Sequence, residues 1–402
     1  MSKNILFPQA MDVEDGNGEK ITLSMKEATL RNIFDRRRSY MMITTPKGQN
    51  LVGGGMIRYR IPLINTSKDY DKTNNVASGT AYEEVYVNIE NVRTQGVEIN
   101  KFDYSMLVNG GELQAETLAN VQESIICDKN MYFFNGLKTF FDEHPEKTIY
   151  LPDLSTMKVL SQDALRSLQK ILQVNIAQIS RTMNKKYVGV PSNELFTIVD
   201  AYAAINANLL LTGLNASDRA YMTLVLGIVG PENGGDFRLG GNLYVIDNFL
   251  EQNLPANFSF NETAMDLSNY NGFILHRDAV AFPFGIQDTY AWINQHSHKP
   301  EFWVDYCFGF KVVREDLVRA YVKDMRAVNN PTIYVNQTSD ISSLTNVNAN
   351  FIDVRLSSSD ESVAQIVGTK IKGIATGKAD ITLTTSDGEE LTFSVAVAEE
   401  KK

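Results

Sequence analysis

The sequence predicts an α+β protein in which a long mixed region of helices and strands is followed by a small all-β domain. Alternating apolar and polar residues indicate strands within residues 51–100. Apolar residues at three- and four-residue spacing indicate helices over residues 102–142 and 161–184. Beyond Pro331 the chain is rich in Ser, Thr, Val and Ile and loses helical periodicity, which favours a β-sandwich.

The length, charge and cysteine content of the chain limit the number of domains and the classes of function that are expected. The 402 residues are enough for two or three domains of roughly 100–200 residues each. The net charge of −10 argues against a protein that binds nucleic-acid phosphates over a large surface. It is compatible with a protein that encloses nucleic acid. The two cysteines, Cys127 and Cys307, are far apart and form no metal-ligand motif, so we expect two buried thiols in a reducing compartment.

Residues 1–50 are expected to form an N-terminal arm and a helix. The apolar spacing from Ile21 to Asp35 is helix-like, and the basic run of Arg36 to Arg38 follows it. That run suits either a subunit or nucleic-acid contact or simply a solvated helix end. The N-terminus lacks the pattern of a secretory signal, and no apolar run reaches the ~20 residues that a membrane span needs.

Residues 51–100 are expected to form a long hairpin. Ile57, Tyr59 and Ile61 alternate with arginines, and a second alternating run lies at 85–90. The polar stretch of residues 65–79 separates the two runs. A loop of that length is longer than a compact domain needs and is usually functional or disordered.

The helices are expected to be packing elements because their apolar residues form single stripes. The first stripe contains Leu113, Leu118, Val121, Ile125, Met131, Phe134, Leu137 and Phe141. The second contains Leu165, Leu168, Ile171, Leu172, Ile176 and Ile179.

Residues 185–330 alternate short strands and helices, and we expect a mixed domain there. The expected strands are 195–199, 242–246, 273–275, 279–282 and a long one over 306–313, and the expected helix is 217–225. We place the boundary to the last domain near Asn329 to Pro331.

The sequence offers little for catalysis. The glycine-rich stretch at 230–236 lacks the GK[ST] ending of a phosphate-binding loop, and there is no nucleophile elbow. His296 and His298 could share one face of a strand, but a lone pair is a weak metal signal. The adjacent pairs Glu83-Glu84 and Glu389-Glu390 point to opposite strand faces and cannot flank one bond. We therefore expect no enzyme activity, no catalytic or metal residues and no cofactor.

The order of the elements resembles that of the major capsid proteins of tailed bacteriophages, which share the Hong Kong phage capsid fold. Residues 56–92 look like its E-loop hairpin, and the helix around 113–141 looks like its spine helix. The stretches Gly241 to Asn248 (GNLYVIDN) and Gly272 to Phe282 (GFILHRDAVAF) resemble passages of its axial domain. The resemblance covers roughly residues 20–330, and it implies that 101–330 form the peripheral and axial capsid core.

The tail is similar to bacterial immunoglobulin-like domains of group two. The matching stretches are Val354 to Ala364 (VRLSSSDESVA) and Ile371 to Thr382 (IKGIATGKADIT). Leu356 stands where that family commonly has Trp, but it is still apolar. The resemblance implies that Ile371, Ile381 and Leu383 lie in strands, that Gly373 and Gly377 lie in turns, and that 331–402 form an Ig-like sandwich.

The two resemblances imply a capsid subunit that assembles with itself into hexamers and pentamers of an icosahedral head. They imply a virion location after assembly in the host cytoplasm, portal proteins as partners, DNA enclosed without sequence-specific binding, and no membrane. Whether a scaffold protein takes part is left open. Subunit contacts are expected at Arg58, Arg60, Lys68, Asp69, Lys72, Glu83 and Glu84. The alternative is a surface adhesin or glycan-binding protein that uses the Ig-like domain on host glycans.

Overall fold

The computed structural model describes part of the chain, in two compact units. The described residues are 11–14, 20–23, 54–64, 81–98, 121, 124–125, 128, 132–151, single positions between 174 and 187, 195–200, 237–239, 242–247, 267–276, 279–293, 300–350, 352–386 and 388–399. Unit one comprises Met1–Gly136 and Arg277–Val313, and unit two comprises Leu137–His276 and Arg314–Lys402. Each unit is described by itself.

Unit one begins with two short antiparallel strands, β1 (Met11–Glu14) and β2 (Lys20–Leu23), with Val13 opposite Ile21. The helix expected from Ile21 is therefore wrong for residues 21–23. The segment Lys-Ile-Thr-Leu alternates polar and apolar residues and contains two β-branched ones, which suit a strand. The rest of the expected helix, residues 24–35, and the basic run after it lie outside the described residues.

The expected hairpin is confirmed. Strand β3 (Met56–Pro62) pairs antiparallel with β4 (Tyr82–Asn88), so that Ile57 lies opposite Val87 and Arg60 opposite Glu84. Residues on β3 alternate strictly between exposed and buried up to Ile61, as the period-2 pattern predicted. The polar loop over 65–79 lies outside the described residues.

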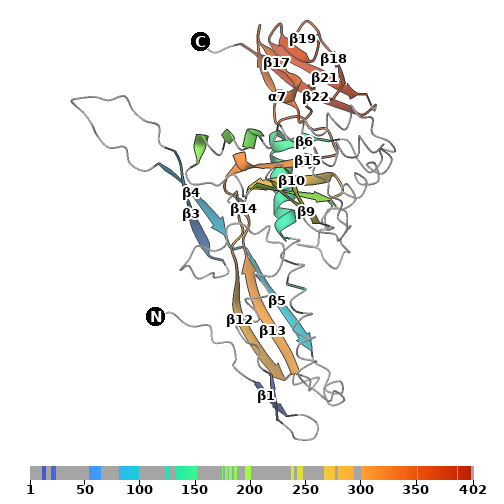
Figure 1. Cartoon of the computed structure of the whole chain (residues 1–402). Coiled ribbons are helices and arrows are strands. Elements are labelled where there is room, and N and C mark those ends of the chain that lie inside the picture. The colour runs from blue at the N-terminus through green and yellow to red at the C-terminus, as the bar shows by residue number, and fades with distance from the viewer. Residues whose placement is uncertain are drawn as a thin grey trace, which may run out of the picture. The chain divides into compact units, whose positions relative to one another are not determined.

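The largest sheet of unit one has three long strands, which Figure 1 shows side by side. They are β5 (Asn91–Glu98), β12 (Phe284–Ile293) and β13 (Pro300–Phe308), with β13 antiparallel to both neighbours. The sequence did not reveal β5 and β12, because their apolar residues alternate irregularly. His296 and His298 lie outside the described residues.

The long strand expected over 306–313 is wrong in extent. Strand β13 begins at Pro300 and ends at Phe308, and a separate two-residue strand β14 (Lys311–Val312) pairs with β11 (Val280–Ala281). Gly309 lies at the break, where a Cβ would be only 2.3 Å from the backbone oxygen of Asn88. The close approach of the hairpin backbone therefore requires glycine at this position.

Aromatic side chains fill the core of unit one. Phe133 packs edge to face against Phe282 and Phe310, at centroid distances of 5.7 and 5.8 Å. Tyr132 stacks on Phe308 at 4.9 Å. Cys307 is buried in β13 and forms no disulfide.

The described part of the first long helix covers residues 132–143 and single helical positions at 121, 124, 125 and 128. Its apolar stripe is buried as predicted at the described positions Val121, Ile125, Phe134, Leu137 and Phe141. Ile179 of the second predicted helix is buried, and described positions between 174 and 186 are helical. The remaining stripe residues and the expected helix over 217–225 lie outside the described residues.

Unit two contains a six-stranded mixed sheet in the order β6-β15-β10-β7-β9-β8. Its strands are β6 (Thr148–Tyr150), β7 (Leu195–Asp200), β8 (Phe237–Leu239), β9 (Asn242–Asp247), β10 (Tyr270–His276) and β15 (Val318–Val322). The expected strands at 195, 242 and 273 are thus confirmed. Short 3-10 helices, η1 (Pro145–Lys147) and η5 (Glu315–Leu317), precede β6 and β15.

The end of unit two, beyond Pro331, is mostly strand, as expected. One sheet has the order β16-β22-β21-β18 and the other the order β17-β20-β19. The strands are β16 (Thr332–Tyr334), β17 (Thr338–Asp340), β18 (Val354–Ser358), β19 (Ala364–Val367), β20 (Lys370–Gly373), β21 (Gly377–Thr385) and β22 (Glu390–Ala398), with one short helix α7 (Ile341–Leu344).

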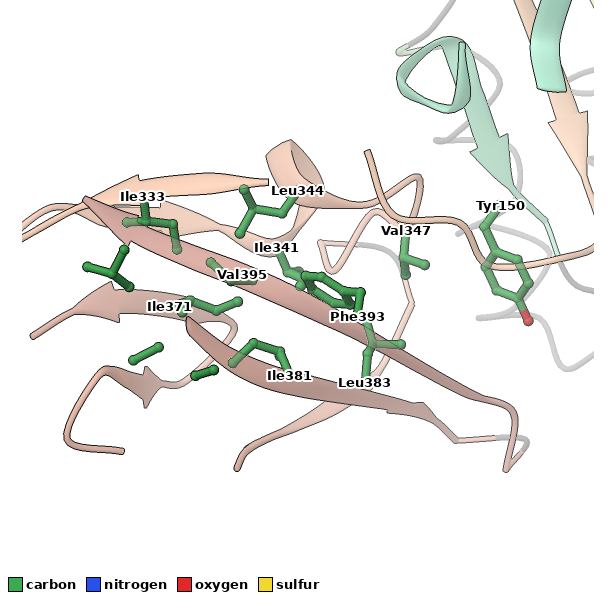
Figure 2. Close-up of a cluster of buried hydrophobic side chains, with 13 residues drawn as sticks. Tyr150, Ile333, Ile341, Leu344, Val347, Ile371, Ile381, Leu383, Phe393 and Val395 are labelled. Carbon is green, nitrogen blue, oxygen red and sulfur yellow. The ribbon is translucent and has the colours of Figure 1, made fainter. Parts of the chain in front are cut away.

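Both of these sheets contribute to one buried core, drawn in Figure 2. Ile381 of β21 and Val395 of β22 are fully buried with Ile371 of β20, so the strands predicted at Ile371, Ile381 and Leu383 are confirmed. Leu356 is partly buried against this core.

The expected turn positions of the two glycines are wrong, because Gly373 ends β20 and Gly377 begins β21. A Cβ on Gly373 would lie 2.6 Å from the backbone oxygen of Tyr334, so close strand packing demands this glycine.

Candidate assembly surface on the hairpin

The hairpin of β3 and β4 has one buried and one exposed face. Ile57, Tyr59 and Ile61 of β3 and Val87 of β4 are buried. Because side chains alternate along a strand, the residues between them form the opposite face. We call this opposite face of the two strands the hairpin outer face; its residues are Met56, Arg58, Arg60, Tyr82, Glu84, Tyr86 and Asn88.

The buried face fixes the register. A shift of one residue would exchange the two faces and expose Ile57 and Ile61. Burial also raises the pKa of the Tyr59 phenol above its ordinary value. Among the described residues no partner lies within hydrogen-bonding distance of its hydroxyl.

Charge on the hairpin outer face is arranged around Glu84. Its Oε1 lies 3.5 Å from NH1 of Arg58 and 3.3 Å from Nε of Arg60. Glu84 also accepts a hydrogen bond of 3.2 Å from the Tyr86 hydroxyl. All these groups are partly or largely exposed, so each ion pair contributes only ~0–1 kcal/mol to stability.

The same face exposes a large apolar area for a hairpin of this size. Met56, Tyr82 and Tyr86 are 62%, 50% and 46% exposed. The Arg60 guanidinium lies over the Tyr82 ring, 5.1 Å from its centroid. Tyrosine and arginine are the residue types enriched at the energetic centres of protein interfaces, which makes this surface suited to binding another protein.

The hairpin is fixed to the rest of unit one at its base. The backbone amides of Gly54 and Ile89 donate to the oxygens of Ile89 and Gly55, at 2.9 Å each. Lys311 of β14 donates through Nζ to the Tyr86 backbone oxygen at 3.2 Å. The first two bonds extend the pairing of the hairpin's own two arms, and the Lys311 bond joins the hairpin to another segment of unit one.

The structure brings three of the expected contact residues together. Arg58, Arg60 and Glu84 form one cluster within the hairpin, whereas Glu83 lies opposite Ile61 and points to the other face. Lys68, Asp69 and Lys72 lie outside the described residues. Tyr82 and Tyr86 were not among the expected residues, because exposure of an aromatic side chain in a strand is visible only once the register is known.

The described part of unit one has a second polar cluster, which stabilises its sheet. Asp128 accepts a hydrogen bond of 2.5 Å from the Tyr306 hydroxyl and lies 3.6 Å from NH1 of Arg93. Desolvation by burial, the hydrogen bond to Asp128 and its charge raise the Tyr306 pKa. The Asp128 carboxylate thus joins Tyr306 of β13 to Arg93 of β5.

Among the described residues, no helix is long and apolar enough to cross a bilayer. No group of three or more His, Cys, Asp or Glu side chains is arranged there to hold a metal ion.

No protein-family model and no curated protein matches this sequence. Solved structures do. A structure from Mycobacterium phage Che8 is 17% identical and covers 67% of this chain and 85% of its own, with a TM-score of 0.38. The capsid of cyanophage P-SCSP1u is 12% identical over 71% of this chain and 93% of its own, with a TM-score of 0.43.

Two further similarities extend the range of sources. A virus-like particle from Pyrococcus furiosus is 10% identical over 74% of this chain and 96% of its own, with a TM-score of 0.40. A xylanase from termite gut that contains a bacterial Ig-like domain is 21% identical over 18% of this chain and 20% of its own, with a TM-score of 0.16. Identities and TM-scores of this size do not assign the chain to a family.

Proposed function

We propose that this chain is the major capsid protein of a tailed bacteriophage, with a structural and not an enzymatic role. Copies of it assemble into an icosahedral head, and the hairpin of β3 and β4 serves as an E-loop that binds a neighbouring copy. The observation that carries the proposal is the hairpin outer face, with its exposed Tyr82, Tyr86 and Met56 around a pair of arginines.

The physical logic is that of repeated weak contacts. A symmetric shell repeats the same contact between many copies, so the binding free energy of each single contact can be small. Burial of the apolar area of the hairpin outer face would contribute ~25 cal/mol per Å². The exposed ion pairs around Glu84 would set the register of the contact more than its strength.

The element order of the whole chain supports the same role. Among the described residues, the hairpin of β3 and β4 precedes the long helix, whose described part ends at residue 143, and the strands of the mixed sheet follow that helix, in the order expected from the resemblance. In this proposal the chain is located in the virion and meets portal proteins at one vertex. Its net charge of −10 is compatible with a shell that encloses DNA without binding it sequence-specifically.

We further propose that the two sheets beyond Pro331 form an Ig-like domain displayed on the outer surface of the head. Support comes from their shared core and from Leu356, which packs against that core where the Ig-like pattern has its anchor.

Electron microscopy of negatively stained protein tests the assembly. The wild-type chain is expected to form closed particles or hexameric rings, with a scaffold protein added if none forms alone. A chain that stays monomeric at high concentration with scaffold present contradicts the proposal.

A double variant, Tyr82→Ser with Tyr86→Ser, tests the hairpin outer face. It should reduce particle yield at least about tenfold, because exposed tyrosines at interface centres contribute ~2 kcal/mol or more. Tyr334→Ser is the matched control, since that tyrosine is 41% exposed on β16, far along the chain from the hairpin. Equal particle yields for wild type and the double variant, with unchanged circular dichroism, would refute the role of this face.

A further inference from the structure

The segment that joins the mixed sheet of unit two to the sheets beyond Pro331 follows a fixed path. The Arg326 guanidinium donates to Asp142 at 3.0 Å and to Asp324 at 2.8 Å. Asn329 donates through Nδ2 to the backbone oxygen of Glu143 at 3.2 Å. Both Asp142 and Glu143 end the described helix, so the segment is bound to that helix on one side.

Asn346 holds the segment on its other side. It is 7% exposed, and its Oδ1 accepts from the Arg326 backbone amide at 2.8 Å. Its Nδ2 donates to the Thr148 hydroxyl at 3.2 Å and to the Asp324 backbone oxygen at 3.1 Å. One buried side chain from the C-terminal part therefore forms hydrogen bonds with groups on β6 and on the joining segment. Its own amide oxygen and nitrogen both have partners, as buried polar groups require.

The backbone of Asn346 continues this arrangement. Its amide donates to the Arg326 oxygen, and its oxygen accepts from the Tyr150 amide, both at 2.9 Å. Strand β6 is one of the two edge strands of the six-stranded sheet, so the Tyr150 amide is an edge group. Exposed edge groups invite pairing with other chains, and Asn346 occupies one of them.

The Tyr150 side chain completes the contact from the mixed sheet. It is 1% exposed and belongs to the buried cluster made mainly by the C-terminal strands, as Figure 2 shows. Its hydroxyl donates to Glu389 Oε2 at 2.8 Å. A core residue of the C-terminal part is thus supplied by strand β6, and Tyr150 and its partner Glu389 are 239 residues apart in the chain.

We propose that residues 331–402 are a fixed cap on the β6 edge of the six-stranded sheet, and not a module on a flexible tether. The cap and the sheet share the Tyr150 core position and the Asn346 hydrogen bonds, so they unfold as one cooperative element. Any surface that the C-terminal part presents is therefore held at one orientation to the mixed sheet. This inference concerns the single chain and stands whether or not the chain forms a shell.

Hydrogen exchange on the full-length, unassembled chain tests this proposal. In the wild type, amides of β6, β15 and β22 should open with the same free energy. Asn346→Ala leaves the Arg326 amide and the Asp324 oxygen without their partner. It should raise exchange about tenfold or more in β6 and β15 as well as in residues 344–347. Asn350→Ala is the matched control, because Asn350 is exposed and its hydrogen bond to Asn348 is made by the backbone amide.

Exchange that rises only within 331–402, with β6 and β15 unchanged, would show an independent module and overturn the proposal.

A second variant keeps the test decisive if Asn346→Ala fails to fold. Tyr150→Phe retains the ring and removes the hydroxyl that donates to Glu389, and it should raise exchange about two- to tenfold in both β6 and residues 385–389. Unchanged hydrogen exchange in both β6 and residues 385–389 would also contradict the proposal of a fixed cap.

Discussion

At the scale of single residues, the described part of unit two contains a network of charged and polar groups that share partners. The Tyr270 hydroxyl donates to Asp142 at 3.0 Å, and the Arg326 guanidinium lies over the Tyr270 ring at 5.7 Å. Arg326 is half-buried, and hydrogen bonds to charged groups stabilise more than neutral ones. The network links three parts of the chain that are distant in sequence.

The Asp142 carboxylate makes this network sensitive to acid. Desolvation by burial acts to raise its pKa. Hydrogen bonds from Lys138 and Tyr270 and the nearby positive charges outweigh that effect, so the Asp142 pKa lies below its ordinary value. A carboxylate with a depressed folded-state pKa adds stability above its unfolded pKa and loses that stability as the pH falls through the folded value.

We therefore predict that Asp142→Asn lowers the thermal unfolding midpoint at pH 7 and that the difference from wild type shrinks below roughly pH 4. The amide keeps the acceptor for Tyr270 but removes the charge that faces Arg326. Differential scanning calorimetry at pH 7, 5 and 3 measures the difference. A difference that grows toward pH 3 would contradict the assigned sign.

At the scale of elements, close approaches decide which positions in and beside the strands require glycine. Position 309, just after β13, requires glycine because a Cβ there would lie 2.3 Å from the backbone oxygen of Asn88. Gly96 of β5 lies opposite Trp303 of β13, and a Cβ on Gly96 would be 2.5 Å from the indole ring. The ring thus covers the glycine, an arrangement that stabilises glycine within a strand pair.

Gly96→Ala is expected to displace the Trp303 ring, to shift tryptophan emission and to destabilise unit one by ~1–3 kcal/mol. The two tryptophans of the chain, Trp292 and Trp303, both lie in this sheet, so fluorescence reports on it directly. In a Trp303→Phe background the same glycine substitution should cost less, because a smaller ring can move. An equal cost in both backgrounds would show that the indole does not make glycine necessary.

At the scale of the whole molecule, the chain forms two units that each contain distant segments. Unit one joins residues before Gly136 to Arg277–Val313, and unit two begins at Leu137 and resumes at Arg314. The long helix thus has residues in both units. In the proposed shell, assembly depends on contacts between copies and needs no covalent bond between them.

We accordingly expect particles dissolved in boiling SDS to migrate as a single band at the monomer mass of 45.0 kDa. Lys68 and Lys72 are the lysines of the hairpin that could take part in a cross-link, and we predict that neither does. A ladder of multiples on the gel would contradict this prediction. In that case Lys68→Arg and Lys72→Arg variants would show which lysine is responsible.

Sequence reasoning predicted those elements whose residues repeat with a clear period. The hairpin, the described helical stripe from Val121 to Phe141 and the strands of the C-terminal part follow local periodicity, because burial of one face depends on spacing alone. The same reasoning predicted a helix at Ile21, where the structure has a strand, and one long strand over 306–313, where the structure has the end of β13 and the separate two-residue strand β14.

The sequence by itself determined the α+β character, the hairpin and the strand-rich segment beyond Pro331. Tertiary structure alone decided which strands pair, that position 309 requires glycine, and that Tyr150 lies in the core of the C-terminal part. It also decided that Arg58 and Arg60 share Glu84 while Tyr82 and Tyr86 stay exposed. The physical reason is that periodicity records only which face of an element is buried, whereas partners distant in sequence are chosen by packing and by the satisfaction of buried polar groups.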